Sequence, residues 1–102
     1  MSGGDWKAMF KAIQDNDLEL VKFYLNTGID PNYQHPEFMA LPLAECLRYN
    51  NLEIAKLLLS KGAKPLIIEM ETGITVLENA KRMKKEEFIS VIDNFLDQES
   101  PN

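Results

Sequence analysis

Four apolar residues near the start of the chain recur at helical spacing. They lie at positions i, i+3, i+4 and i+7, and they are Trp6, Met9, Phe10 and Ile13. This spacing places all four on one face of a helix. The sequence therefore predicts an amphipathic first helix that buries this face.

A polar pair separates this helix from the next apolar stretch. Asn16 tolerates the left-handed conformation that ends a helix, and Asp17 is a good N-cap for a helix that follows. The pair Asn50 and Asn51 interrupts a later apolar stretch in the same way. Both pairs predict a tight helix-turn-helix connection.

Two stretches, residues 18–27 and 52–61, are apolar on more than one side. Their Leu, Val, Ile, Phe and Tyr residues do not fit a single helical stripe. A helix that is apolar nearly all round packs between neighbours. Gly28 and Gly62 follow these stretches, where a residue without Cβ ends a helix at low cost. We expect two sandwiched helices, each ended by a glycine.

The chain repeats itself at a constant spacing, which equals the distance in sequence from Gly28 to Gly62. Residues 17–31 align with residues 51–65, with Leu, Glu, Lys, Leu, Gly and Pro identical, and a third, more divergent copy follows. Such repeats are stacked units that cannot bury their apolar faces alone. We expect one domain over residues 5–96, with units at about 5–38, 39–72 and 73–96, and flexible ends at 1–4 and 97–102.

Each unit is predicted to consist of two helices followed by a long loop. The two loops are rich in Pro, Gly and Asn and show no helical period. We call them the first finger (residues 28–41) and the second finger (residues 62–75). Loops of this length without a helix of their own usually carry function. The predicted fold is an all-α solenoid of helix-turn-helix units with protruding finger loops.

These units resemble ankyrin repeats. The family pattern is roughly Gly-x-Thr-Pro-Leu-His-x-Ala, a turn, and a Leu-rich helix that closes on Gly-Ala-Asp. The matching segments are Gly73-x-Thr75-x-Leu77 with Ala80, Pro42-Leu43, Leu57-Leu58-Leu59 with Gly62-Ala63, and Gly28-Ile29-Asp30-Pro31-Asn32. Tetratricopeptide repeats, whose period equals the spacing seen in this chain, are the main alternative fold. They lack a long Pro/Gly finger, and their Trp-x-x-Leu-Gly-x-x-Tyr signature is absent from this sequence.

Several departures from the ankyrin pattern concern the fingers. The spacing in this chain exceeds the usual ankyrin period by a single position, so both fingers should bulge slightly. The family His is replaced by Phe10, Ala44 and Glu78 in the three copies, which removes its usual hydrogen bonds to the loop. Met39 takes the loop Gly position, and Leu66 replaces the Asn of the first finger. We expect fingers less regular than those of the family.

Composition and charge exclude several kinds of chemistry. One Cys and one His rule out a structural zinc site within one copy and a disulfide framework. The formal net charge of −5 opposes binding to phosphate backbones. No apolar run approaches the roughly 20 residues that span a bilayer, and no signal peptide is evident. We expect no cofactor or metal, no nucleic-acid or membrane partner, a monomer and a cytoplasmic location.

The residues of catalytic type have plainer explanations. Cys46 fits a packed small apolar side chain on a first helix, and His35 fits an exposed or partner-contacting imidazole. Glu69 and Glu71 lie on the second finger and are expected to be solvated. The basic run at residues 81–85 is flanked by Glu and indicates a solvated helix. We therefore expect no enzymatic activity.

The resemblance to ankyrin repeats implies that the finger tips and the exposed sides of the first helices form one concave face, which contacts partners. The matching positions here are Gln14, Asp15, Glu37, Phe38, Ala40, Arg48, Tyr49, Glu71, Thr72, Ile74, Arg82 and Met83. Aromatic, Met and Arg residues are enriched at interface cores. The alternative for Phe38 and Ile74 is that they fold back onto their own units.

Two functions fit these observations. The first is a non-catalytic scaffold that binds one protein partner through the concave face. It predicts that Tyr49→Ala and Arg48→Glu abolish partner capture without lowering the melting temperature. The second is a dedicated inhibitor or immunity protein that neutralises a toxin or enzyme, because a short acidic chain can be steered toward a basic target.

Overall fold

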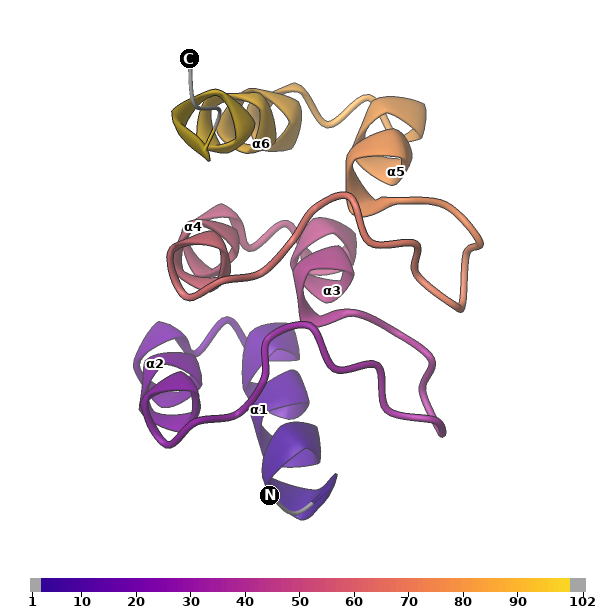
Figure 1. Ribbon diagram of the computed structural model, residues 1–102. Coiled ribbons are helices and arrows are strands. Elements are labelled where there is room, and N and C mark those ends of the chain that lie inside the picture. Colours follow the sequence, from indigo (N-terminus) through magenta and orange to yellow (C-terminus); the bar gives the residue numbers. More distant parts are fainter. Residues whose placement is uncertain (1–2, 100–102) are drawn as a thin grey trace.

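The computed structural model describes residues 3–99 of the chain. Three units, each a pair of antiparallel helices, stack along one axis (Figure 1). The helices are α1 (Gly3–Gln14), α2 (Leu18–Asn26), α3 (Pro42–Tyr49), α4 (Leu52–Ser60), α5 (Val76–Arg82) and α6 (Glu86–Glu99). Within residues 3–99 no β-strand forms, and a single antiparallel bridge joins Ile68 to Thr75. The predicted all-α solenoid of helix-turn-helix units is confirmed.

The helices form two columns. The first helices α1, α3 and α5 make one column, and the second helices α2, α4 and α6 make the other (Figure 1). Both fingers project beyond the first-helix column, on the side away from the second-helix column (Figure 1). The first-helix column and the fingers thus border one side of the molecule.

The helical part of the chain extends beyond the expected domain bounds at both ends. Helix α1 begins at Gly3 and α6 ends at Glu99, whereas the expected domain covered residues 5–96. The remainder of the expected flexible ends, residues 1–2 and 100–102, lies outside the described residues.

The polar pairs form the tight turns that the sequence predicted. Asn16 and Asn50 both have φ of 58°, in the left-handed region. Asp17 caps α2, and its Oδ1 accepts a hydrogen bond from the Leu20 N–H at 3.2 Å. Asn51 takes another role, because its buried side-chain amide donates to the Ile13 carbonyl of the preceding unit. This contact joins the first unit to the second.

Glycine decides where the second helices end. Gly28 and Gly62 have φ of 102° and 101°, a conformation that strains other residues. They follow α2 and α4, which have nine residues each. The third unit has Leu96 at the equivalent position, and α6 continues through it to a length of 14 residues. A longer helix therefore replaces the finger in the last unit.

The third unit also explains one departure from the family pattern. Glu78, which stands where the family has His, closes a capping box with Thr75 at the start of α5. The Thr75 hydroxyl accepts a hydrogen bond from the Glu78 N–H at 3.0 Å. This exchange satisfies two N–H groups at the N-terminus of the helix. Glu78 therefore provides local hydrogen bonds at the position where the family His would make its own.

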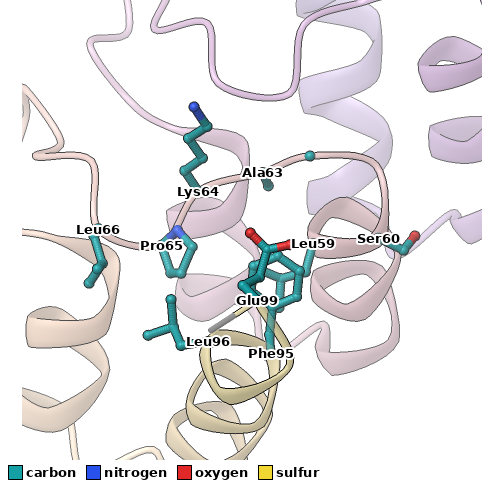
Figure 2. A pocket seen from close by; sticks show the side chains of 10 residues that line it. Leu59, Ser60, Ala63, Lys64, Pro65, Leu66, Phe95, Leu96 and Glu99 are labelled. Atoms are coloured by element: carbon teal, nitrogen blue, oxygen red, sulfur yellow. The ribbon is translucent and has the colours of Figure 1, made fainter. Parts of the chain in front are cut away.

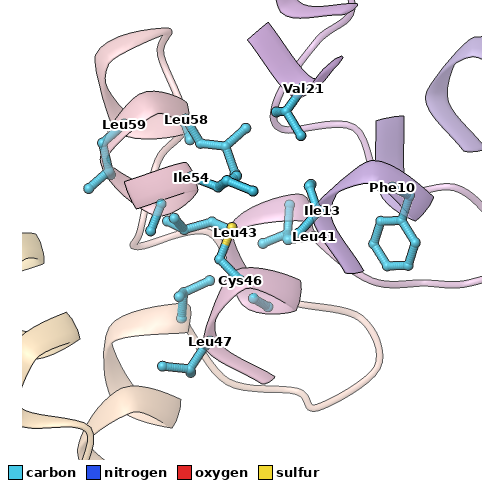
Figure 3. Packing of buried hydrophobic residues seen from close by; sticks show 14 of the residues in the cluster. Phe10, Ile13, Val21, Leu41, Leu43, Cys46, Leu47, Ile54, Leu58 and Leu59 are labelled. Carbon is cyan, nitrogen blue, oxygen red and sulfur yellow. The ribbon is translucent and has the colours of Figure 1, made fainter. Parts of the chain in front are cut away.

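The hydrophobic core runs along the stack and is centred on α3 (Figure 3). The predicted face of α1 is buried there together with the apolar residues of α3 and α4. Cys46 lies fully inside this core, as expected, and burial raises the pKa of its thiol. Ala12 and Ala80 occupy the equivalent buried positions of the other units.

Candidate partner-binding face

The twelve residues predicted to contact a partner differ widely in exposure. Eight are exposed, namely Asp15, Glu37, Phe38, Tyr49, Glu71, Thr72, Arg82 and Met83, and Gln14, Arg48 and Ile74 are half-buried. Ala40 is only 3% exposed, so its prediction as a surface residue was wrong. It directly precedes the buried start of α3 and packs into the core there.

Six of these twelve residues meet around one shallow hollow between the first and second units. Its volume is about 230 Å³. It is lined by Phe10, Gln14, Phe38, Ala40, Glu45, Arg48, Tyr49 and Glu71. We call it the central hollow. Residues of α1, α3 and both fingers contribute to it, whereas Arg82 and Met83 lie outside its lining.

Glu69 was expected to be solvated, and this prediction was wrong. Its side chain is 1% exposed, although it belongs to the second finger. One carboxylate oxygen lies 2.6 Å from the Arg48 guanidinium, and the other accepts a hydrogen bond from the Leu41 N–H at 3.0 Å. The buried charge is thus paired and hydrogen-bonded, as burial requires. Glu69 attaches the second finger to α3.

Arg48 is the centre of an ion network beneath the central hollow. Its guanidinium lies 2.9 Å from the buried Glu45 carboxylate and 3.3 Å from the exposed Glu71 carboxylate, in addition to its contact with Glu69. Desolvation acts to lower the pKa of Arg48, but hydrogen bonds to Glu69 and Glu45 outweigh it and raise that pKa. Arg48 therefore holds the fold together and is not a free contact residue.

The ion network reaches the first unit through Gln14. The Gln14 side-chain amide donates to Glu45 at 2.8 Å, so the second oxygen of this buried carboxylate is also satisfied. Glu45 belongs to α3, whereas Gln14 is the last residue of α1. Gln14 thus couples the two units directly, and Arg48 holds the Glu45 carboxylate that Gln14 binds.

Phe38 combines the two roles that the sequence left open. Its ring stacks on Phe10 and Trp6 of its own unit, with centroid distances of 5.5 and 5.8 Å. It nevertheless stays 42% exposed and lines the central hollow. His35 joins the same aromatic cluster, 5.4 Å from the Trp6 ring. The imidazole, which the sequence predicted to be exposed or in contact with a partner, is half-buried in this cluster.

An ion pair borders the aromatic cluster. The Lys7 ammonium lies 2.8 Å from the Glu37 carboxylate and 5.9 Å from the centroid of the Phe38 ring. The Lys7 hydrogen bond and charge lower the pKa of Glu37. Lys7 is therefore paired within the first unit, with its charge already balanced.

Tyr49 is the aromatic residue of this face with the fewest interactions within the chain. It is the last residue of α3, and its side chain is 48% exposed at the central hollow. Among the described residues, none makes a ring contact or a side-chain hydrogen bond with it. Its ring and hydroxyl are available to another molecule.

A cavity larger than the central hollow lies elsewhere and was not predicted. It has a volume of about 420 Å³ and opens between α4, the start of the second finger and the end of α6 (Figure 2). Leu59, Pro65, Leu66, Phe95 and Leu96 give it a mainly apolar lining. The signals in the sequence were Leu66 in place of Asn and the absence of glycine at residue 96. The cavity arises where a finger is replaced by a longer helix.

Within residues 3–99, no group of three or more His, Cys, Asp or Glu side chains is arranged to hold a metal ion. None of the helices in this part of the chain has the length and apolar character needed to cross a membrane.

Comparison with known proteins identifies relatives for most of this fold. A family model described as ankyrin repeats (many copies) matches residues 9–59. An ankyrin repeat protein of Acanthamoeba polyphaga mimivirus is 32% identical over 63 residues, which is 62% of this chain and 38% of the viral protein. Human 2-5A-dependent ribonuclease is 34% identical over 67 residues, which is 66% of this chain and 9% of the human protein. The matched segments span less than half of either relative.

Proposed function

Because the chain belongs to the ankyrin repeat family, whose repeats are in general non-catalytic protein–protein interaction modules, we propose that it binds a protein partner. The contact surface is the face formed by the fingers and the first helices. Around the central hollow this face carries Phe38 and Tyr49, and Met83 lies at the end of α5.

The observation that carries this proposal is the exposure of Tyr49 on an otherwise well-engaged helix. Residues 42–47 of the same helix are all buried. Fold stability does not require a half-exposed tyrosine, without a ring contact or side-chain hydrogen bond, at the end of such a helix. Tyrosine is among the residues that contribute most to protein interfaces. Met83 is the C-cap residue that follows α5, and it is 41% exposed.

Affinity capture with matched variants tests the proposal. The wild-type chain and the double variant Tyr49→Ala/Met83→Ala are used as baits in lysate, and each captured protein is purified and titrated against both baits. We expect the double variant to lose roughly thirtyfold in affinity, the range of interface hot spots. Its melting temperature should stay close to that of the wild type, because both side chains are exposed.

Phe23→Ala provides the matched control. Phe23 is another exposed aromatic residue, but it lies on α2 in the second-helix column. We expect this variant to retain full affinity. A partner that binds the double variant as tightly as the wild type, and loses affinity only with Phe23→Ala, would place the contact surface on the opposite side of the molecule.

A further inference from the structure

The geometry points to the chemistry of the partner: the central hollow accepts a cationic side chain, an arginine or lysine, of a protein that binds this face. This inference rests on the proposed function, because it concerns the same surface. It follows from the balance of charge in the hollow, from its aromatic border and from its size.

The ion network beneath the hollow carries an excess of negative charge, and Glu45 and Glu71 of this network line the hollow itself. Three carboxylates, those of Glu45, Glu69 and Glu71, surround the single guanidinium of Arg48. This leaves an excess of two negative charges where two of the carboxylates are buried. The nearby cation, Lys7, is paired with Glu37. Incomplete solvation strengthens the attraction of such a site for a positive charge.

Glu71 is the carboxylate that an incoming cation can reach. It is exposed, and it makes the longest contact with Arg48 of the three, 3.3 Å. Its backbone N–H is hydrogen-bonded to the Met39 carbonyl at 2.9 Å, so the side chain starts from a fixed position on the second finger. A second guanidinium or ammonium group can share this carboxylate from the solvent side.

Three aromatic side chains line the same hollow, and two of them, Phe38 and Tyr49, are exposed. Phe38 comes from the first finger and Tyr49 from α3, and both line the hollow. Aromatic faces attract guanidinium and ammonium groups, with arginine favoured. Phe38 already has one such cation near its ring, that of Lys7, whereas no cation of residues 3–99 lies over the Tyr49 ring. Tyr49 is therefore the aromatic group that an arginine of the partner would contact.

The size of the hollow fits one side chain. Its volume of about 230 Å³ lies below the roughly 300–1,000 Å³ of small-molecule pockets.

An anionic group of a partner would have to displace Glu45 or Glu69 from Arg48, which would leave a buried carboxylate unpaired. The hollow therefore selects for positive charge on the partner.

A pair of short peptides tests this inference without knowledge of the partner. The probes are Ac-Gly-Ser-Arg-Ser-Gly-amide and the same peptide with citrulline, which has the shape of arginine but no charge. Each is titrated into the ¹⁵N-labelled full-length chain at low ionic strength. We expect the arginine peptide to shift the amide resonances of Phe38, Tyr49 and Glu71 in a saturable way. The citrulline peptide should bind at least fivefold more weakly.

Two charge-matched variants locate the effect. Glu71→Gln should weaken binding of the arginine peptide by roughly two- to fivefold, as expected for one partly exposed ion pair. Glu19→Gln changes the net charge equally, but on α2 in the other helix column, and should have no effect. Equal binding of both peptides, or equal weakening by both variants, would overturn the inference.

The outcome is separable from that of the proposed function. If Tyr49→Ala/Met83→Ala abolishes capture of a partner while the two peptides bind alike, the face binds its partner without a cation in the hollow. If the arginine peptide binds selectively while the double variant retains every partner, the hollow binds cations but the proposed partner face is wrong.

Discussion

The junction between the first and second units is held by hydrogen bonds from one finger to the other, which the second junction lacks among the described residues. Asn32 of the first finger extends across it to the backbone of the second finger. Its side-chain amide donates to the Gly62 carbonyl at 2.9 Å, and its carbonyl oxygen accepts from the Lys64 N–H at 2.8 Å. One side chain thus satisfies two backbone groups of the next unit.

Gln34 repeats this arrangement further along the same two fingers. Its amide donates to the Ile68 carbonyl at 3.1 Å and accepts from the Met70 N–H at 2.7 Å. Because these bonds pair side chains of one finger with backbone of the other, the fingers support each other. The first junction also contains the Gln14 contact with Glu45, next to the central hollow.

The second junction is more apolar and less well filled. Leu66 stands where the first finger has Asn32, and α6 occupies the place of a third finger. The cavity of about 420 Å³ lies there, and a second one of about 340 Å³ lies beside it between α4 and α6. One polar contact crosses near the turns, from the Lys85 ammonium to the Asn50 side chain.

The difference shows what a finger contributes to a neighbouring unit. A finger provides backbone groups that an Asn or Gln side chain of the preceding finger can bind. A unit without a finger must rely on packing between helices, which here leaves cavities. Regions with fewer buried contacts open at lower free energy, so the third unit should open before the first two separate. The central hollow lies at the better-held junction.

The largest expected effect comes from removing the cation of the ion network that borders the first junction. Arg48→Met removes the guanidinium from Glu69 and Glu45 and leaves two buried carboxylates without their cation. Loss of one partner of a buried ion pair costs about 3–5 kcal/mol of unfolding free energy. Urea unfolding measures this loss. The same change at the exposed Arg82 should cost less than about 0.5 kcal/mol, and equal losses would contradict the assigned role of Arg48.

This prediction replaces the expectation that Arg48→Glu would leave the melting temperature unchanged. A fourth carboxylate in place of the guanidinium would add repulsion to the loss of the pair. Partner capture by such a variant would therefore report on unfolding as well as on the binding face, so Tyr49 and Met83 are the better positions to change.

We expect an intermediate effect from a substitution that makes the first junction resemble the second. Asn32→Leu removes two hydrogen bonds to the second finger. At about 0.5–1.5 kcal/mol for each bond, the unfolding free energy should fall by roughly 1–3 kcal/mol. The reverse change, Leu66→Asn, should alter stability by less than about 0.5 kcal/mol, because α6 offers no finger backbone opposite it. A clear gain from Leu66→Asn would show that the junctions are more alike than we infer.

The smallest effect tests whether α3, which belongs to both junctions, is sealed from solvent. Burial raises the pKa of Cys46 above its ordinary value of about 8.5. Above that pH the unfolded chain loses the thiol proton while the folded chain keeps it. The unfolding free energy should therefore fall by roughly 1 kcal/mol between pH 7.5 and 9.5. Urea unfolding with reductant measures this decrease.

Cys46→Ala is the control for this pH dependence. Alanine occupies the equivalent buried positions of the other two units, so the variant should fold. It should lack the decrease in stability at alkaline pH. The same decrease in both proteins would mean that other groups cause it.

The fold could be predicted from the sequence because its signals are local. Apolar spacing gave the face of α1, and the Asn and Gly residues at the turns gave the ends of the helices. Each of these signals depends on a few neighbouring residues and on backbone conformations that few residue types adopt. The repeat then fixed how the units stack, because equivalent positions recur at a constant spacing along the chain.

The candidate site was predicted less well because its contacts join distant residues. Glu69 looked like a solvated loop carboxylate, but Arg48 and the Leu41 N–H, from 21 and 28 residues earlier, enclose it. No spacing rule links Glu69 of the second finger to an arginine of α3, because α4 lies between them in the sequence. For the same reason the sequence predicted Arg48 and Gln14 to be available to a partner, although both bind carboxylates within the chain. Ala40 was predicted to lie on the surface, although it is buried next to the start of α3.

The contacts of Asn32 have a consequence for modularity. Both of its hydrogen bonds go to backbone groups, so they do not depend on which side chains the next unit carries. A duplicated segment spanning residues 17–50 would bring its own Asn32 and present the backbone of its own Gly28 and Asp30 to the copy before it. Such an insertion would lengthen the array and keep the same two hydrogen bonds at each new junction. A duplicate of residues 51–84 would carry Leu66 in place of Asn32 and would lack these hydrogen bonds.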